Sequence, residues 1–436
     1  MTDTAPAPAG WELRSFTASS SSPASSSDAR LAAWLEATAL GYHEVPPTPE
    51  HVRRTAEVYA ADERTLTGAY LSSSPIGAWS ANRPVATYAA FDKTLNVGNG
   101  QLLRAHLIGG VTVRSTHRRR GIMRAMLETD LRRAAADGIP IAALFSMEAT
   151  IYGRFGFGAA TSTNRVEVDT GEGFELNSAP TGRVEVADAA ALVGVSPAVF
   201  ARFHDQTLGS IERAASYPSK IAGLWAEDRP DADPTVRAAL HYDGDEIDGY
   251  VAYRFLGWTN QPRALEIVDI VALSTDAYLG LWQYLASIDL VTRVRLEHAS
   301  PDDPLLWALR DRRGYSVTGQ TDGLWLRILD PASALKARNY EADGEVTFSV
   351  ADPLDVCGGV YRLAARSGAA EVEKLDGNVD APLAMDISAL GSLYLGGVRA
   401  RTLAEAGRIT VRSTPALDTL DALMAQRGDP FCATHF

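Results

Sequence analysis

The 436-residue sequence contains only two cysteines, Cys357 and Cys432. Neither lies in a Cys-x-x-Cys or Cys/His pattern, so the chain has no disulfide framework and no sign of a structural metal. Its apolar runs fall well short of the roughly 20 residues that a membrane-spanning helix needs. The opening residues, MTDTAPAPAG, lack the basic and apolar segments of a signal peptide. We therefore expect a reduced, cytoplasmic protein with no metal and no membrane partner.

Basic residues are also scarce. The chain has 41 Lys and Arg against 54 Asp and Glu, which gives a formal net charge of -13 and a pI of about 5.1. A nucleic-acid-binding protein usually carries a basic domain, so nucleic acid is excluded as the main partner. An acidic surface instead suits a cationic partner.

The hydrophobic pattern predicts a mixed α/β fold of three domains. A strand, two helices, antiparallel strands, a basic loop, a helix and a further strand fill residues 1–170, with a Ser-rich loop at 15–30. A similar order of elements recurs over 183–318. From 325 to 436 the strands and helices become shorter, which indicates a separate α+β domain.

The basic loop is the strongest local signal. In VTVRSTHRRRGIMRAMLETDL, residues 111–131, a strand leads into Arg118, Arg119, Arg120 and Gly121, and then into an amphipathic helix. The first N–H groups of a helix have no internal partner and carry partial positive charge. A glycine there lets a phosphate approach the backbone, and arginines add forked donors. The stretch therefore predicts a phosphate-binding site. In the repeated order of elements over 183–318, the corresponding loop reads STDAYLG (274–280), which contains an acidic residue and no basic residue.

This loop resembles the coenzyme A loop of the GNAT superfamily of N-acetyltransferases, Q/R-x-x-G-x-G/A, although Met123 stands where that pattern has Gly or Ala. Further blocks are similar to the Eis (enhanced intracellular survival) family: AALFSMEATIYGRFGFGAAT, DGLWLRIL, LGSLYLGGVRARTLAEAGRI and a terminal phenylalanine. They occur in the family's order and extend to the last residue.

The resemblance implies an active GNAT domain, a degenerate second GNAT-like domain without the coenzyme loop, and a C-terminal domain of the sterol-carrier-protein fold. It implies acetyl-CoA as cosubstrate and a homohexamer. The acceptors would be amines, notably those of aminoglycosides, or lysine side chains of proteins and peptides. Its coenzyme-binding residues would be Val111, Thr112, Val113, Arg118, Arg119, Arg120, Gly121, Ile122, Met123, Arg124, Met147 and Glu148.

Acetyl transfer needs an acid and a base. The acceptor must attack the thioester as a neutral amine, and the thiolate must then leave. The resemblance assigns the acid to Tyr152, since a phenol is protonated at neutral pH. No side chain stands out as the base. In the family the base is the α-carboxylate of the last residue, which is Phe436 in this sequence, preceded by His435 where relatives can have an acid.

Substrate choice is predicted less sharply. Trp34, Tyr42, His43, Glu44 and His435 are candidates for lining the acceptor pocket, with plain structural roles as the alternative. Two other functions stay open at this point. In the first, the natural acceptor is a lysine of a protein or peptide. In the second, the chain is a lipid or sterol carrier with a vestigial acetyltransferase domain.

Overall fold

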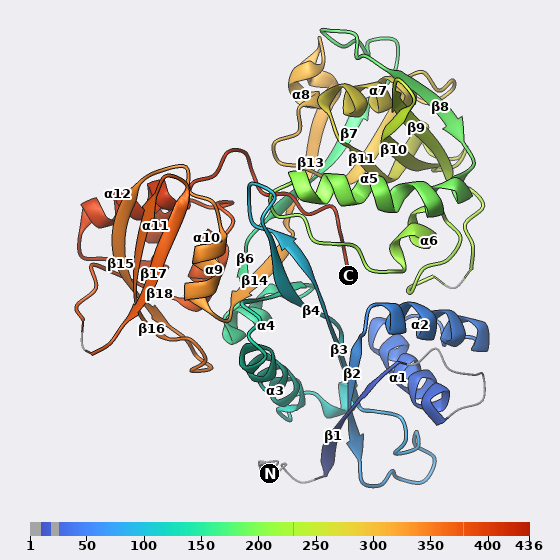
Figure 1. Cartoon of the computed structure of the whole chain (residues 1–436). Coiled ribbons are helices and arrows are strands. Elements are labelled where there is room, and N and C mark those ends of the chain that lie inside the picture. Colours follow the sequence, from blue (N-terminus) through green and yellow to red (C-terminus); the bar gives the residue numbers. More distant parts are fainter. Residues whose placement is uncertain (1–9, 19–25, 230, 378) are drawn as a thin grey trace.

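The computed structural model describes residues 10–18, 26–229, 231–377 and 379–436. They form three sheets, each with its own helices, and we call these the first, second and third units (Figure 1). The mixed α/β class predicted from the sequence is confirmed. No helix within the described ranges is both long and apolar enough to cross a membrane.

The first unit is built on a seven-stranded sheet in the order β1-β2-β3-β4-β5-β14-β6. Its strands are β1 (Trp11–Thr17), β2 (Thr65–Leu71), β3 (Ala86–Asn96), β4 (Leu102–Val113), β5 (Ile141–Phe145), β14 (Leu324–Ile328) and β6 (Gly158–Ala159). Its helices are α1 (Ser26–Tyr42), α2 (Pro49–Ala61), α3 (Ile122–Ala136) and α4 (Ala149–Tyr152), with 3-10 turns η1 (Ser115–His117) and η2 (Gly153–Phe155). The predicted loop at 15–30 is shorter than expected, and its residues 19–25 lie outside the described residues.

The second unit repeats this architecture in the order β8-β9-β10-β11-β12-β7-β13. The strands are β8 (Arg183–Ala187), β9 (Arg237–Asp243), β10 (Glu246–Phe255), β11 (Ala264–Ala272), β12 (Arg293–Ala299), β7 (Ser162–Asp169) and β13 (Tyr315–Asp322). The helices are α5 (Leu192–Gln206), α6 (Tyr217–Ile221), α7 (Thr275–Ala286) and α8 (Leu305–Ala308), with η3 (Ala189–Ala191) and η4 (Arg312–Gly314).

The two units exchange strands. β7 comes from the end of the first repeat, yet it pairs with β12 and β13 in the second sheet. β14 comes from the end of the second repeat and pairs with β5 and β6 in the first sheet. Sheet membership therefore differs at these two strands from the predicted ranges 1–170, 183–318 and 325–436.

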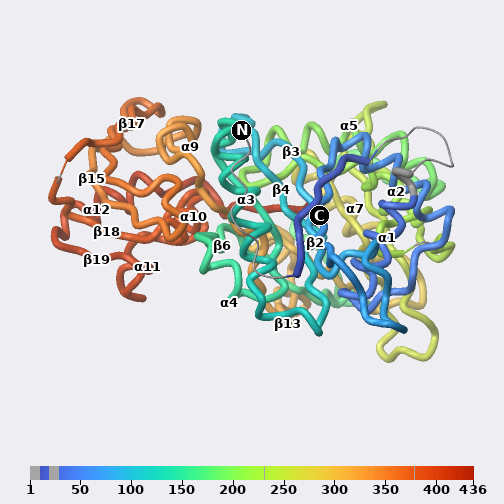
Figure 2. The backbone as a smooth tube through the Cα atoms, turned by 90° about the horizontal axis from the view of Figure 1, so that it is seen from below, coloured from blue at the N-terminus to red at the C-terminus, as the bar shows by residue number. Residues whose placement is uncertain are grey.

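The third unit has a five-stranded sheet in the order β17-β16-β15-β18-β19. Its elements are α9 (Pro331–Ala337), β15 (Gly344–Ala351), β16 (Gly359–Arg366), β17 (Ala369–Leu375), β18 (Leu383–Asp386), α10 (Ile387–Leu393), α11 (Ala400–Glu405), β19 (Ile409–Val411) and α12 (Thr414–Met424). Its largest core continues into one face of the first sheet through Leu107, Leu324 and Leu326. Beyond α12 the chain leaves this unit and ends between the other two (Figures 1 and 2).

α3 covers the opposite face of the first sheet. Its buried residues Ile122, Met126, Leu127 and Leu131 recur at helical spacing and pack on Ile108 and Leu144 in one core. This packing fixes the start of α3 beside the end of β4, where the basic loop lies.

Candidate active site

The start of α3 is an open helix end. Gly121 has a φ of 75°, no side chain caps the first turn, and a Cβ added there would touch nothing within 4 Å. Arg118, Arg119, Arg120 and Arg124 are all exposed around this end. In the described part of α3, the arginine ion pairs are made further along, by Arg132 and Arg133. Free N–H groups and unpaired guanidinium groups together suit a phosphate.

β4 separates from β5 just before this loop. The two strands pair in parallel only from Ala105 to Ile108, opposite residues 141–144. The ladder to β3 shifts register between Thr87 and Ala89, so β4 carries a bulge around Gly110, whose φ is 58°. A bulge leaves one residue of β4 outside the regular ladder, just past the last residue that pairs with β5.

Trp34 holds this bulge from behind. Its ring would lie 2.9 Å from a Cβ added to Gly110, and its indole N–H donates to the Thr67 carbonyl at 2.9 Å. Trp34 is fully buried. The predicted contact with the acceptor therefore does not agree with its position, because a side chain without exposed surface supports the strand instead of lining a pocket.

Tyr152 ends α4 on one side of the opening. Its ring packs edge-on against Phe157, and burial raises the pKa of its phenol, with smaller contributions from nearby Tyr42 and Glu148. A phenol whose pKa is raised stays protonated at neutral pH and can donate a proton. Met147 is 85% exposed just before this helix, and Glu148 is exposed as well.

Tyr42 approaches from the other side, at the end of α1. Burial and the Glu44 carboxylate raise the pKa of its hydroxyl, while a hydrogen bond from the backbone of Val111 acts in the opposite direction. α1 comes this close because Gly41 packs against Thr112, which is itself buried and bonds Thr87. The sequence placed Tyr42 among the pocket residues, and the structure brings it beside Val111 and Tyr152.

The terminal carboxyl group of Phe436 lies against β4. A Cβ added to Gly109 would lie 3.7 Å from the carboxyl carbon and 3.8 Å from a carboxyl oxygen. Gly109 directly precedes the bulge and follows the last residue that pairs with β5. The ring of Phe436 meets those of Phe91 and Phe145 edge-on at 6.0 and 5.2 Å. The last residue of the chain therefore reaches the point where the two strands part.

His435 is turned away from this opening. Its ring stacks between Phe145, at 4.4 Å, and His298 of β12, at 4.0 Å. Burial, followed by the charges of His298, Lys220 and Arg213, lowers its pKa to about 3. It is therefore neutral at pH 7, and its place under the tail differs from the substrate contact predicted for it.

Two carboxylates from different units meet near Tyr42. Glu44 is exposed, and its pKa is raised by partial burial and by repulsion from Asp228. Asp228 follows Glu227, which bonds the buried Arg64 at 3.0 and 3.1 Å and ties the second unit to the first. No sequence pattern points to Asp228, because it lies 184 residues from Glu44 and only the docking of the two units brings them together.

Ser146, at the end of β5, is a further residue that sequence reasoning missed. Its hydroxyl is buried and has no hydrogen-bond partner within the described residues. A buried polar group without a partner costs free energy. Ser146 therefore has an unused hydrogen-bonding group directly after β5.

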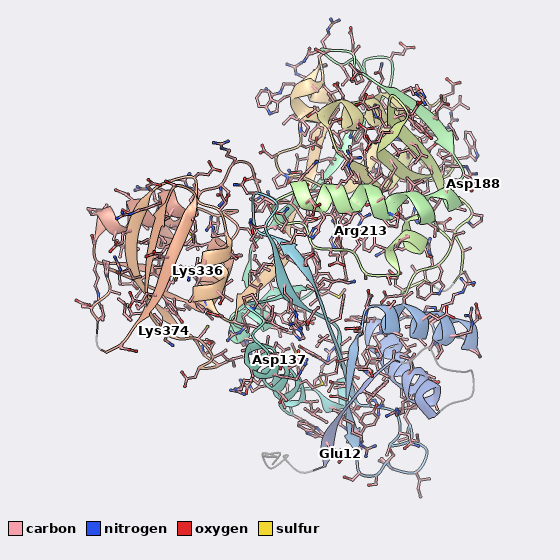
Figure 3. All side chains as sticks on the ribbon, in the orientation of Figure 1. Glu12, Asp137, Asp188, Arg213, Lys336 and Lys374 are labelled. Atoms are coloured by element: carbon pink, nitrogen blue, oxygen red, sulfur yellow. The ribbon has the colours of Figure 1, made fainter. Side chains whose placement is uncertain are left out.

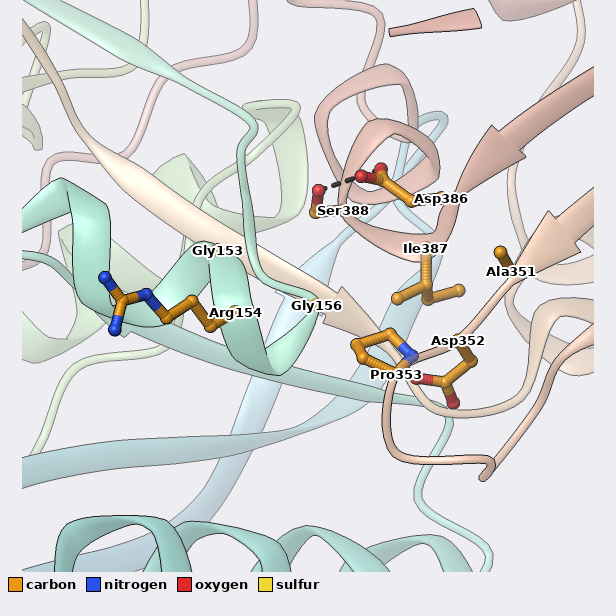
Figure 4. A pocket seen from close by; sticks show the side chains of 9 residues that line it. All are labelled: Gly153, Arg154, Gly156, Ala351, Asp352, Pro353, Asp386, Ile387 and Ser388. Carbon is orange, nitrogen blue, oxygen red and sulfur yellow. Dashed lines mark hydrogen bonds between the residues drawn. The ribbon is translucent and has the colours of Figure 1, made fainter. Parts of the chain in front are cut away.

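A hollow of about 400 Å³ lies behind the Tyr152 turn, against the third unit (Figure 4). Its lining consists of Gly153, Arg154, Gly156, Ala351, Asp352, Pro353, Asp386, Ile387 and Ser388. Beneath it, Arg327 pairs with Asp352 at 2.8 Å with no exposed surface and also bonds the Phe155 carbonyl. The hollow contains none of the predicted site residues. No group of three or more His, Cys, Asp or Glu suited to a metal occurs among the residues that the structure describes.

Comparison with known proteins identifies the domains of the chain. Residues 24–160 and 209–328 each match a model of an acetyltransferase (GNAT) domain, and residues 331–433 match a sterol carrier protein domain. The N-acetyltransferase Eis of Mycobacterium tuberculosis is 34% identical over 354 residues, which cover 80% of this chain and 85% of that protein. An uncharacterized N-acetyltransferase of Streptomyces avermitilis is 33% identical over 417 residues, covering 94% and 97%.

Solved structures agree. The crystal structure of Eis1 from Mycobacterium abscessus superimposes with a TM-score of 0.80 at 26% identity and covers 98% of this chain and 100% of that one. A GNAT-type acetyltransferase from Anabaena variabilis has a TM-score of 0.78 at 20% identity, which supports the fold alone. The fold and the open coenzyme loop define an acetyl-CoA-dependent N-acetyltransferase of the GNAT class. Within that class, the chain belongs to the Eis family. The predicted plan of two GNAT-type domains and a sterol-carrier-like domain is confirmed.

Proposed function

We propose that this N-acetyltransferase acetylates amines of a polycationic acceptor, with aminoglycosides as the acceptor class, and uses Tyr152 as acid and the Phe436 carboxylate as base. The observation that carries this proposal is the position of the terminal carboxyl group against Gly109, at the point where β4 leaves β5.

The first unit fits acetyl-CoA. The open end of α3 and its exposed arginines would hold the pyrophosphate, and the freed backbone of β4 at Val111 and Val113 would bond the pantetheine arm. Ser146, whose buried hydroxyl has no partner within the described residues, directly follows β5. When bound, acetyl-CoA supplies an acetyl group activated as a thioester.

The chain's own groups would then move two protons. The Phe436 carboxylate accepts a proton from the acceptor amine, directly or through a water, because an α-carboxyl group is ionised at pH 7. The Tyr152 hydroxyl donates a proton to the departing sulfur. The Tyr42 hydroxyl, which accepts the Val111 N–H, would donate a hydrogen bond to the acetyl oxygen as it gains negative charge.

Charge supports the choice of acceptor. Glu44 and Asp228 repel each other beside Tyr42, and a polyamine placed between them would relieve that repulsion. We expect Glu44→Gln and Asp228→Asn each to raise KM for an aminoglycoside while leaving KM for a simple monoamine unchanged. Glu57→Gln, on the exposed face of α2 and paired with Arg53, is the matched control.

The main experiment measures CoA release with acetyl-CoA and an aminoglycoside, in wild type and in a protein extended by Gly-Ser after Phe436. The extension keeps every side chain and replaces the terminal carboxylate by an amide, so kcat should collapse while thermal stability and coenzyme affinity hold. Phe436→Leu keeps the carboxylate in place and should lose far less activity. An extended protein with wild-type kcat would refute the terminal base.

A second variant tests the acid. Tyr152→Phe should lower kcat by roughly 10²–10⁴-fold, the usual contribution of a general acid, with coenzyme affinity nearly unchanged. Tyr70→Phe, which removes a hydroxyl on β2, is the control. Release of CoA with lysine peptides and with no aminoglycoside would overturn the acceptor class. If no amine caused release of CoA and the protein bound a lipid, the carrier function would be favoured. The homohexamer stays a prediction, to be checked by measuring the molecular mass in solution.

A further inference from the structure

The last six residues of the chain are held by the backbone and side chains of the second unit. The Phe431 N–H donates to the Leu208 carbonyl at 2.8 Å, and the Thr434 hydroxyl donates to the Ile211 carbonyl at 2.8 Å. These two contacts align the tail along the segment that leads from α5 to α6. The tail ends at the centre of the molecule, below α5 (Figure 1).

Two side chains of the same segment bind the tail near its end. The Tyr217 hydroxyl accepts the N–H of His435 at 2.9 Å and lies 3.4 Å from the Ala433 carbonyl. Arg213 reaches the same carbonyl at 3.5 Å. Figure 3 shows Arg213 under α5, on the side that faces the centre. We call Arg213 and Tyr217 the tail clamp.

The tail clamp is anchored in the core of the second unit. Arg213 pairs with Asp269 of β11 at 2.7 and 2.9 Å and also bonds the hydroxyl of Tyr250 on β10. Its guanidinium group lies over the Tyr217 ring at 4.2 Å, and Tyr217 is buried. Both clamp side chains are therefore fixed before the tail arrives, which lowers the entropic cost of holding it.

Chain ends are usually frayed unless other parts of the protein bind them. In this chain the tail must bring one carboxyl group to Gly109 of the first unit. On that side the Phe436 ring makes aromatic contacts with Phe91 and Phe145. The polar contacts that set how far the tail extends come from the second unit. A loss of these contacts would let the carboxyl group drift along β4 without changing the coenzyme loop.

We propose that the second GNAT-like unit, which lacks the coenzyme loop, positions the catalytic terminus of the chain through the tail clamp. Arg213 and Tyr217 are positioning residues in this proposal, which rests on the terminal base proposed above. The second unit then contributes to catalysis without binding coenzyme.

The test is Tyr217→Phe, which keeps the ring and removes the hydroxyl that accepts the His435 N–H. One lost hydrogen bond predicts a fall in kcat of about three- to tenfold, with KM for acetyl-CoA within about twofold of wild type. Tyr253→Phe is the control, because its hydroxyl bonds Tyr284 of the same unit at 2.7 Å and not the tail. The control should retain wild-type kcat.

A double variant separates positioning from a general structural effect. In the protein extended by Gly-Ser, the terminal carboxylate is already lost, so adding Tyr217→Phe should not lower kcat further. Multiplied losses in the double variant would overturn the positioning role.

A second readout does not depend on the catalytic base. A carboxypeptidase that prefers aromatic termini should remove Phe436 faster from Tyr217→Phe than from wild type or Tyr253→Phe, as followed by mass spectrometry, because cleavage follows the detached population of the tail. Equal rates in all three proteins would overturn the tail clamp. If cleavage were faster in Tyr217→Phe but the protein extended by Gly-Ser were fully active, the tail clamp would stand and only the terminal base would be refuted.

Discussion

The first and second units share one architecture and differ at one helix start. In each, a long strand pairs in parallel with its neighbour over four residues and then feeds a helix, β4 into α3 and β11 into α7. α3 begins at Gly121 without a cap. α7 begins at Ser274, whose hydroxyl accepts the Ala277 N–H, and has Asp276 in its first turn. The shared fold therefore presents two different helix starts, because the Ser274 hydroxyl occupies one N–H of α7 and Asp276 adds negative charge there, which disfavours an anion.

Because β7 and β14 are exchanged, we expect that removal of the second unit would destabilise the first. Each sheet completes its sixth position with a strand from the other repeat. Arg327 of β14 further holds the turn after Tyr152 from below. The second repeat therefore contributes a strand and a buried arginine to the first sheet, and in the proposal above it also contributes the tail clamp.

The largest expected effect comes from giving α3 the start of α7. Gly121→Asp places a capping carboxylate at the open helix end, in a left-handed position that Asp tolerates better than most residues. The carboxylate takes the N–H groups and repels phosphate. Losing two charge-assisted contacts of about 1.5–3 kcal/mol each predicts a rise in Kd for acetyl-CoA of about a hundredfold or more, measured by calorimetry.

Gly138→Asp is the matched control, since Gly138 follows the other end of the same helix with a φ of 73° and open space around it. It should leave coenzyme affinity unchanged. A Gly121→Asp protein that binds acetyl-CoA like wild type would show that the open helix end is not the phosphate site.

A smaller effect is expected from one arginine of the loop. Arg119 is exposed and has a φ of 62°, in the left-handed region. Arg119→Ala should raise KM for acetyl-CoA about ten- to a hundredfold and leave KM for the amine nearly unchanged. Arg132→Ala, further along α3, should change neither constant, and a coenzyme KM within twofold for Arg119→Ala would remove that residue from the site.

The difference between the two helix starts was visible in the sequence, because it resides in neighbouring residues: RRRG in one repeat and STDAYLG in the other. The strand exchange was not visible. β7 alternates buried with more exposed positions, and β14 is mostly apolar. Either pattern suits either sheet, so only tertiary packing decides which sheet each strand joins. The same limit applies to Trp34, whose helical spacing is compatible with a pocket wall or with the core, and to Tyr217 and Asp228, whose partners lie far along the chain.

The tail should respond to acid, since the second unit holds it through a neutral histidine. The folded pKa of His435 is about 3, below the usual 6.5, because of burial and the charges of His298, Lys220 and Arg213. Above pH 6.5 the His435 ring is neutral in both the docked and the detached tail, so docking of the tail has its full stability. Between pH 6.5 and 3 only the detached tail takes up a proton, so docking weakens as the pH falls.

Removal of Phe436 by carboxypeptidase should accordingly be about tenfold faster at pH 5 than at pH 7.5, relative to a free peptide of the same C-terminal sequence. His435→Phe keeps a ring between Phe145 and His298 and removes the titration. The variant should show a flatter pH dependence. An equally steep dependence in the variant would assign the acid response to another group.

The smallest effect is expected at the start of α7 in the second unit. Ser274→Ala removes the hydroxyl that caps α7, and loss of such a cap costs about 1 kcal/mol. The free energy of unfolding of the second unit should fall by that amount, as seen in denaturant melts, because the Ala277 N–H is left to water. KM for acetyl-CoA and kcat should not change, since the stretch STDAYLG at the start of α7 contains an acid and no arginine and the tail clamp does not involve α7. A second coenzyme bound per chain in Ser274→Ala would contradict this, and would show that the cap alone had closed a site which the fold still offers.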